Sequence, residues 1–272
     1  MKVLIIIGSL ALVTGELASS DCNGVVVRGK CHEKEVLADN LDRPFRIIVD
    51  FHTNVLYFSY SIDNNTVSGY LDLNTKELGN ITQVPEGFAH AVDQNRHEVY
   101  IGTFNKDGIY KFFYNNKTAE RVGANGVDIW SMFYKDELYY STYPDEVVYT
   151  LKNGESIELE DMKGNEAEIF VVDRDDYEFF KNGSGLYGKR RGTTDADLYD
   201  TQIIVRSLVT DVFGVIHACS ENGIYVVDKN KKMLEKIADI DDGFSLAFDR
   251  DNNMVYSDSL QIIRLKLKSG DF

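Results

Sequence analysis

A unit of about 40 residues recurs six times along this chain of 272 residues. The unit reads as an apolar strand, a polar turn, a second strand with an aromatic residue and a third strand that contains Tyr in five of the six copies. Successive turn positions are separated by 43, 40, 40, 37 and 39 residues. These positions are Asp50, Asp93, Phe133, Asp173, Thr210 and Asp249. A spacing this regular indicates an architecture built from one repeated structural unit.

Two further columns keep the same period, and apolar and polar residues alternate in the strands that contain them. This alternation, together with turns such as Asp-Arg-Asp-Asn-Asn, favours antiparallel strands over helices. The column in the second strand consists of Tyr57, Tyr100, Tyr139, Phe180, His217 and Tyr256. The column in the third strand consists of Tyr70, Tyr110, Tyr149, Tyr187, Tyr225 and Arg264.

We therefore predict an all-β fold, a six-bladed β-propeller with antiparallel four-stranded blades. The strand-like residues 25–37 precede the first copy, and the last copy ends at Lys268 without room for a fourth strand. We expect the N-terminal strand to complete the last blade and close the ring. The alternative is a large sandwich with accidental periodicity. No linker divides residues 21–272, so these residues are expected to form a single domain.

Residues 1–20 have the pattern of a secretory signal peptide, with a basic start, an apolar middle and small residues at the end. A buried strand or a membrane anchor is the alternative, but a span needs about 20 apolar residues, more than this run has. Secretion agrees with four Asn-X-Ser/Thr sequons in polar, turn-like stretches. We predict a secreted glycoprotein with candidate glycosylation sites at Asn64, Asn80, Asn116 and Asn182.

The three cysteines fit an oxidising compartment. Cys22 and Cys31 flank a short stretch that is able to fold back as a hairpin, so we favour a disulfide between them with Cys219 left free. In the alternative, Cys219 pairs with one of the other two and ties the N-terminus to the body of the domain. No pair or cluster of Cys and His has the spacing of a zinc site.

The charge excludes some classes of partner. The chain has 29 Lys and Arg against 44 Asp and Glu, which gives a net charge of -15. Because an acidic surface repels phosphate backbones and anionic lipid, we expect neither nucleic acid nor a membrane as partner. We further expect a monomer that has no cofactor.

Ligands of propellers bind where the innermost strands meet at one mouth of the central channel. Aligning the copies places two arginines, Arg46 and Arg206, in one otherwise apolar column with Ala89, Ile129, Ile169 and Ser245. The guanidinium fork matches a carboxylate or a sulfate, so the pair predicts capture of an anionic group. The equally weighted alternative is that each Arg pairs with Asp128, Glu168 or another acid of the protein.

Aromatic residues lie near the same strand starts. Trp130 is the sole Trp of the chain, and His90, Phe88 and Phe244 occupy neighbouring columns. Aromatic faces with a few polar groups are typical of a slot for a flat, conjugated ligand. The alternative is that these rings only pack between blades. The predicted ligand-binding residues are Arg46, His90, Trp130, Arg206 and Phe244.

Enzymatic functions find less support. No GxSxG, HExxH or glycine-rich phosphate motif occurs, and we assign no catalytic residue and no metal ligand. The second hypothesis is a calcium-dependent hydrolase of the lactonase or esterase type, with the metal near Asp128 and Glu168. A third is a propeller that binds only other proteins and presents an apolar patch.

Three segments resemble the ommochrome-binding proteins of insect haemolymph, namely LDRPFRIIVDFHTNVLYFSYS, ENGIYVVDKN and GFSLAFDRDNNMVYSD. Together with the signal peptide, the early Cys pair, the size and the acidity, they extend the resemblance over the mature chain. The resemblance implies a secreted haemolymph carrier, not an enzyme, for a flat, acidic pigment derived from tryptophan. It transfers no ligand contacts, so the predicted site rests on the repeat columns alone.

Overall fold

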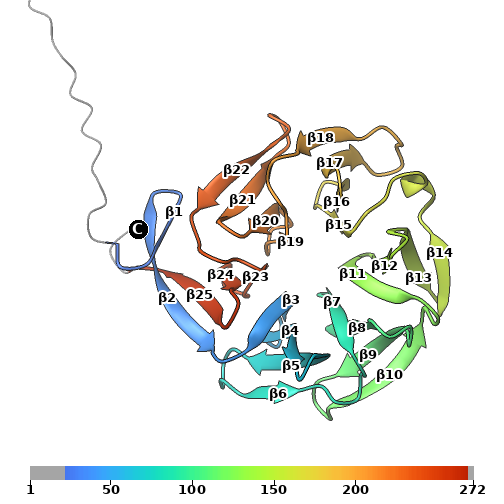
Figure 1. The fold of residues 1–272 in the computed structure, drawn as a ribbon, viewed down its shortest axis with the longest axis horizontal. Coiled ribbons are helices and arrows are strands. Elements are labelled where there is room, and N and C mark those ends of the chain that lie inside the picture. Colours follow the sequence, from blue (N-terminus) through green and yellow to red (C-terminus); the bar gives the residue numbers. More distant parts are fainter. Residues whose placement is uncertain (1–21, 269–272) are drawn as a thin grey trace, which may run out of the picture.

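In the computed structural model, β-sheets stand around a central axis like the blades of a propeller (Figure 1). The structure describes residues 22–268, so the predicted signal peptide lies outside the described residues. Helix within this range is confined to the short 3-10 helix η1 (Glu160–Met162). Nothing helical between residues 22 and 268 is long and apolar enough to cross a bilayer. The all-β, propeller-like fold predicted from the repeats is confirmed.

The first four copies of the repeat each form a separate four-stranded antiparallel sheet whose strands follow chain order. Their first strands surround the centre in Figure 1. The first sheet contains β3 (Asp42–Asp50), β4 (Val55–Ile62), β5 (Asn65–Asp72) and β6 (Leu78–Asn80). The second contains β7 (Gly87–Asp93), β8 (Glu98–Thr103), β9 (Ile109–Phe113) and β10 (Thr118–Gly123). The third contains β11 (Asp128–Lys135), β12 (Glu137–Tyr143), β13 (Val148–Lys152) and β14 (Glu155–Glu158). The fourth contains β15 (Ile169–Val172), β16 (Tyr177–Asn182), β17 (Gly185–Arg190) and β18 (Asp197–Asp200).

The last two copies share one nine-stranded sheet, in which the N-terminal hairpin joins them. The fifth copy contributes β19 (Ser207–Thr210), β20 (Ile216–Ser220), β21 (Gly223–Asp228) and β22 (Met233–Ala238). The sixth contributes β23 (Ser245–Phe248), β24 (Met254–Ser257) and β25 (Ile262–Leu267). The hairpin consists of β1 (Val25–Val27) and β2 (Lys30–Ala38).

The N-terminal strand closes the ring as predicted. β2 pairs with β25 from His32 opposite Leu267 to Ala38 opposite Ile262, and so becomes the fourth strand beside β23, β24 and β25. The sequence did not predict that β1 also joins β22, through Val27 opposite Ala238. This single residue pair merges the last two copies into one sheet, so they are not the separate blades that the repeats suggested.

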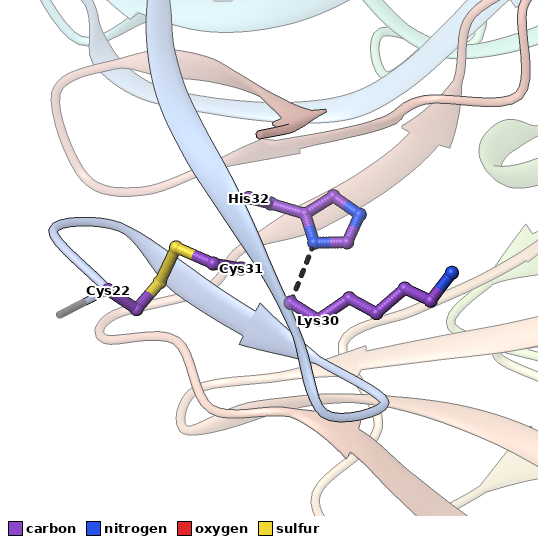
Figure 2. Close-up of a disulfide and its surroundings, with 4 residues drawn as sticks. All are labelled: Cys22, Lys30, Cys31 and His32. Carbon is purple, nitrogen blue, oxygen red and sulfur yellow. Dashed lines mark hydrogen bonds between the residues drawn. A yellow bond between two sulfur atoms is a disulfide. The ribbon is translucent and has the colours of Figure 1, made fainter. Parts of the chain in front are cut away.

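The predicted disulfide between Cys22 and Cys31 is present and ties the start of the chain to the hairpin (Figure 2). Within this hairpin Val26 lies opposite Cys31, and the His32 ring nitrogen Nδ1 is 3.0 Å from the Lys30 carbonyl oxygen. Cys219 is free and buried in β20, as expected.

Aspartates build the turns that follow the innermost strands. The Asp173 and Asp249 carboxylates each accept hydrogen bonds from backbone N–H groups two and four residues further along. Two predicted turn positions are wrong. In the fifth copy Asp211, not Thr210, accepts these bonds. In the third copy Phe133 lies inside β11, because β11 continues to Lys135 and turns at Asp136 without a capping aspartate.

The hydrophobic core lies between neighbouring sheets. Tyr57 and Phe112, from the first and second sheets, belong to one buried cluster, and Tyr139 and Phe180, from the third and fourth, belong to another. The second-strand column found in the sequence supplies several of these side chains, and Tyr57 and Tyr139 are 0% exposed. The repeated aromatic residues therefore pack one sheet against the next.

An ionic cluster fastens the closing strand. Glu35 on β2 accepts hydrogen bonds from Arg264 Nε at 2.8 Å and from Lys76 Nζ at 2.9 Å, and Lys266 Nζ lies 2.9 Å away. Arg264 also donates to Asp249 at 3.2 Å. Burial alone raises the pKa of Glu35, but the hydrogen bonds from these cations outweigh it and lower the pKa from 4.5 to about 2.

We predict that Glu35→Gln lowers the free energy of unfolding by about 1–2 kcal/mol at pH 7, because it removes the charge that Arg264, Lys76 and Lys266 bind. The loss is no larger because these ion pairs are partly exposed to solvent. Because folding lowers the pKa of Glu35, its contribution is complete above pH 4.5 and is lost as the pH falls towards 2. Urea unfolding at pH 7 and at pH 3 measures this difference. Glu33→Gln, an exposed position of the same strand, is the control. An equal loss of stability in both variants contradicts the prediction.

Candidate functional site

Register shifts in three neighbouring innermost strands shape one mouth of the central channel. The pairing of β3 with β4 shifts register between Phe45 and Ile48, that of β7 with β8 between Gly87 and Ala89, and that of β11 with β12 between Ile129 and Ser131. A bulge turns the side chain of the extra residue out of the regular alternation. The residues displaced in this way are Arg46, Phe88 and Trp130.

Phe88 and Trp130 directly precede the strand pairs that begin at Ala89 and Ser131. In the other three copies the equivalent residue precedes the first strand pair, and its N–H donates to the carbonyl of the second strand. We call these five residues, together with Arg46, whose guanidinium contacts two of them, the mouth ring: Arg46, Phe88, Trp130, Glu168, Arg206 and Phe244. The sequence alignment placed Arg46, Ala89, Ile169 and Ser245 together, and each of these lies four residues before a turn aspartate. Ile129 and Arg206 do not belong to that column, because the turns of the third and fifth copies come later in the chain than predicted.

Aromatic side chains cluster on the arc of the mouth ring that the second and third sheets form. The Trp130 ring centroid lies 5.2 Å from that of Phe88 and 5.1 Å from that of Tyr143. Phe104 joins this aromatic cluster, 5.0 Å from Phe88. Tyr143 is 46% exposed, so one side of the cluster faces solvent. The sequence prediction missed Phe104, although its place directly after β8, close to that of Tyr143 at the end of β12, was a signal for it.

Arg46 lies against this cluster without an anionic partner. Its guanidinium carbon is 5.6 Å from the centre of the Trp130 ring and 5.9 Å from that of Phe88. The rest of residues 22–268 supplies no hydrogen-bond acceptor or ion pair for its side chain. Desolvation lowers the pKa of Arg46 to about 10, although the charge of Glu168 opposes this effect. A guanidinium held in this way favours a bound anion.

Two neighbouring strands fix the backbone of Arg46. Its φ of 52° lies in the left-handed region, which few residues other than glycine adopt. The Arg46 carbonyl oxygen lies 3.0 Å from His90 Nδ1, and the Ile47 N–H donates to Ser245 Oγ at 3.2 Å. The peptide between Arg46 and Ile47 is therefore held from β7 on one side and from β23 on the other.

His90 is buried beneath the mouth and supports Arg46 instead of facing solvent. Because the Arg46 carbonyl only accepts, His90 Nδ1 carries the proton and Nε2 accepts from the Ser68 hydroxyl at 3.0 Å. Desolvation lowers the pKa of His90 to about 4, so the ring is neutral at physiological pH.

Arg206 differs from Arg46 because it has protein partners. Its guanidinium donates to the Gly243 carbonyl at 2.9 Å and to Glu221 at 3.2 Å, and it lies 4.8 Å from the centre of the Phe244 ring. The ion-pair alternative weighed from the sequence therefore applies to Arg206, with Glu221 as the acid. Arg46 and Trp130 form one contact group of the mouth ring, and Arg206 and Phe244 form another.

A cavity of about 90 Å³ lies in the channel behind Arg46. Its lining includes the polar residues His90, Ser131, Ser207 and Ser245. Pockets that enclose a drug-sized ligand measure about 300–1,000 Å³. A multi-ring ligand is therefore too large for this cavity, and only a small substituent fits inside it.

The residues of the channel do not fit a calcium ion. Glu168 forms an ion pair with Lys181, and Asp128 accepts a hydrogen bond from the Lys106 N–H at 3.0 Å. The part of the chain from residue 22 to residue 268 brings together no three His, Cys, Asp or Glu residues able to hold a metal. Calcium prefers six to eight oxygen ligands, several of them carboxylates, whereas Arg46 occupies the cavity wall.

Sequence comparison identifies the family. The ommochrome-binding protein of Manduca sexta is 36% identical over 275 residues, which cover 97% of this chain and 98% of that protein. The chain belongs to the ommochrome-binding protein family. This agrees with the resemblance noted in the sequence. No family model matches the chain.

Solved structures share the fold of this ommochrome-binding family member at low identity. A gluconolactonase from Xanthomonas campestris has a TM-score of 0.72 at 12% identity, covering 91% of this chain and 96% of that one. The calcium-binding protein regucalcin from Agrobacterium tumefaciens has a TM-score of 0.64 at 13% identity, with 87% and 96% covered. The WD40 β-propeller domain of Doa1 has a TM-score of 0.56 at 10% identity, with 89% and 97% covered. These similarities establish the fold and leave the activity open.

Arg206 has hydrogen-bond partners in the protein and the Arg46 guanidinium has none within residues 22–268, so the two arginines should affect the stability of the ligand-free protein differently. Arg46→Met should raise the free energy of unfolding by about 1 kcal/mol, because a desolvated, unpaired charge is removed. Arg206→Met should lower it by about 1 kcal/mol, because its hydrogen bonds are lost. Urea unfolding of both variants and the parent protein tests this. Destabilisation of similar size in both variants contradicts the assignment of Arg46 as unpaired.

Proposed function

We propose that this protein carries an ommochrome-type pigment at the mouth of its channel. The observation that carries the proposal is Arg46, a half-buried cation without an anionic partner, placed against an accessible aromatic cluster. The named function of the Manduca sexta relative agrees with a pigment ligand. A flat acidic dye derived from tryptophan has the aromatic rings and the anionic groups that such a surface favours.

In the proposed complex the ring system lies across the mouth, because the cavity of about 90 Å³ is too small for it. Trp130 and Tyr143 provide stacking surface, and Arg46 pairs with an acidic group of the pigment. Arg206 and Phe244 form a second contact on the opposite arc of the mouth ring. His90 contributes through the backbone of Arg46.

We propose binding without turnover. The alternative, a calcium-dependent lactonase or esterase, shares the fold of the gluconolactonase and regucalcin structures. It requires carboxylates directed at the channel, whereas the cavity lining includes Arg46 and three serines. If the protein hydrolyses lactones or aryl esters and EDTA abolishes this activity, the result favours the calcium-dependent hydrolase instead.

We also propose a six-bladed ring, a monomeric state and secretion into haemolymph. Counting the nine-stranded sheet as two blades joined through β1 gives six blades, in agreement with the six copies in the sequence. The N-terminal pattern, the disulfide between Cys22 and Cys31 and the relative in Manduca sexta support a secreted protein.

We predict that titration with a purified ommochrome quenches the fluorescence of Trp130, the sole Trp, and shifts the visible spectrum of the pigment. Arg46→Gln should weaken binding about tenfold to a hundredfold, because one charged hydrogen bond is worth about 1.5–3 kcal/mol. Arg250→Gln, an exposed arginine outside the mouth ring, is the matched control and should leave the affinity unchanged. A protein that neither shifts the spectrum nor loses fluorescence refutes the proposed function.

Exposure of the sequons leads to a prediction about glycosylation. Asn64, Asn80 and Asn116 are exposed, whereas Asn182 is half-buried and its side-chain amide donates to the Glu166 carbonyl at 3.3 Å. We expect the full-length chain secreted from insect cells to carry glycans mainly at the first three sites. Peptide mass spectrometry after enzymatic glycan release measures occupancy. Highest occupancy at Asn182 contradicts this expectation.

A further inference from the structure

A second ring of side chains lies one residue beyond the mouth ring on each innermost strand. Three of its six members are serines, from β11, β19 and β23. All three serines line the cavity behind Arg46. The six residues are Ile47, Ala89, Ser131, Ile169, Ser207 and Ser245.

The hydroxyls of two of these serines have no hydrogen-bond partner in the described part of the chain and open on the cavity. Ser131 and Ser207 are each 5% exposed, and residues 22–268 supply no hydrogen-bond partner to either hydroxyl. By comparison, the buried hydroxyl of Ser59 donates to the Gly87 carbonyl at 2.8 Å, and that of Ser141 donates to the Glu168 carbonyl at 3.1 Å. The hydroxyl of Ser257 is also buried without a partner from residues 22–268, but of these three unbonded hydroxyls only those of Ser131 and Ser207 line the cavity.

Several side chains of the cavity have hydrogen-bond donors without a partner among the residues that the structure describes. Ser245 Oγ already accepts from the Ile47 N–H at 3.2 Å, so its hydroxyl proton is available to donate. With Ser131, Ser207 and the Arg46 guanidinium, four side chains are able to donate into one space. No carboxylate side chain from residues 22–268 lines this cavity. Because the Arg46 guanidinium only donates and is positively charged, a ligand group that satisfies it together with the hydroxyls accepts hydrogen bonds and carries negative charge.

We propose that the cavity is an oxyanion subsite. Ser131, Ser207 and Ser245 donate to one carboxylate or sulfate group, and Arg46 supplies the compensating charge. A volume of about 90 Å³ suits a group of this size and excludes a fused ring system. The inference rests on the proposed function, since the group is an acidic substituent of the pigment whose rings remain outside. An inorganic oxyanion has the same chemistry and is the other source of such a ligand.

The test compares an ommochrome with the same ommochrome after its carboxyl groups are converted to methyl esters. Binding to the full chain is followed by visible absorbance and by Trp130 fluorescence. The variant is the double substitution Ser131→Ala and Ser207→Ala. The control is Ser257→Ala, which removes an unbonded hydroxyl that is buried away from the cavity.

We expect the double variant to bind the acidic pigment about tenfold to a hundredfold more weakly than the parent protein, because hydrogen bonds to a charged group are lost. It should bind the ester as the parent does, so the preference for the acid over the ester falls. A general loss of folding lowers both affinities together and does not change this ratio. An unchanged ratio in the double variant, or a ratio that falls equally in Ser257→Ala, overturns the inference while pigment binding itself stands.

A second arm separates the two sources of the oxyanion and remains informative without pigment. Sodium sulfate is compared with sodium chloride at equal ionic strength, and the melting temperature of each protein is measured. If sulfate stabilises the parent protein and Ser257→Ala but not the double variant, the result supports the subsite. This holds even when no ommochrome binds and the proposed function fails. Equal stabilisation of all three proteins by sulfate, together with an unchanged acid-to-ester ratio, overturns it.

Discussion

The pairing of β2 with β25 is the constraint on which the rest of the structure depends. A ring of sheets keeps unpaired edge strands until its first and last strands pair with each other. Here the residues that form this closing pair, or seam, are more than 220 positions apart in the sequence, as in the hydrogen bond from Arg264 to Glu35. The ionic cluster at Glu35 joins the N-terminal strand to the last copy, and Lys76 extends it to the first sheet. This cluster also explains why the third-strand column has Arg264 where the other five copies have Tyr.

Closure of the ring also determines the geometry of the candidate site. It places β23 of the last copy beside β3 of the first, so that Ser245 receives the Ile47 N–H while His90 holds the Arg46 carbonyl from the other side. The left-handed backbone of Arg46 is thereby held by side chains from two different sheets. The same serine also lines the cavity behind the guanidinium. Closure of the ring and the geometry of the candidate site therefore depend on the same contact between β23 and β3.

Much of the fold was predictable because its signal is periodic. The turn and aromatic columns identified the repeated sheets and the closing strand, and the short spacing of Cys22 and Cys31 favoured the disulfide that is present. The contact of β1 with β22 was not predictable, since it depends on one residue pair, Val27 with Ala238. For the candidate site, the sequence indicated which types of residue lie near the mouth but not how their side chains are arranged. Bulges at Phe88 and Trp130 shift the register, and a bulge is set by packing between sheets more than by local sequence.

The sequence by itself determined the strand period, the aromatic content of the sheet interfaces and the presence of two arginines near the channel. Only the tertiary structure decided which arginine is free. The Arg206 guanidinium donates hydrogen bonds to Glu221 and to the Gly243 carbonyl. The Arg46 guanidinium contacts the Trp130 ring, and Arg46 lines the cavity. The physical reason is that desolvation and partner distance depend on residues brought together from different copies, which no local pattern records. The tertiary structure likewise left the hydroxyls of Ser131 and Ser207 without partners, although serines in strands carry no distinguishing sequence signal.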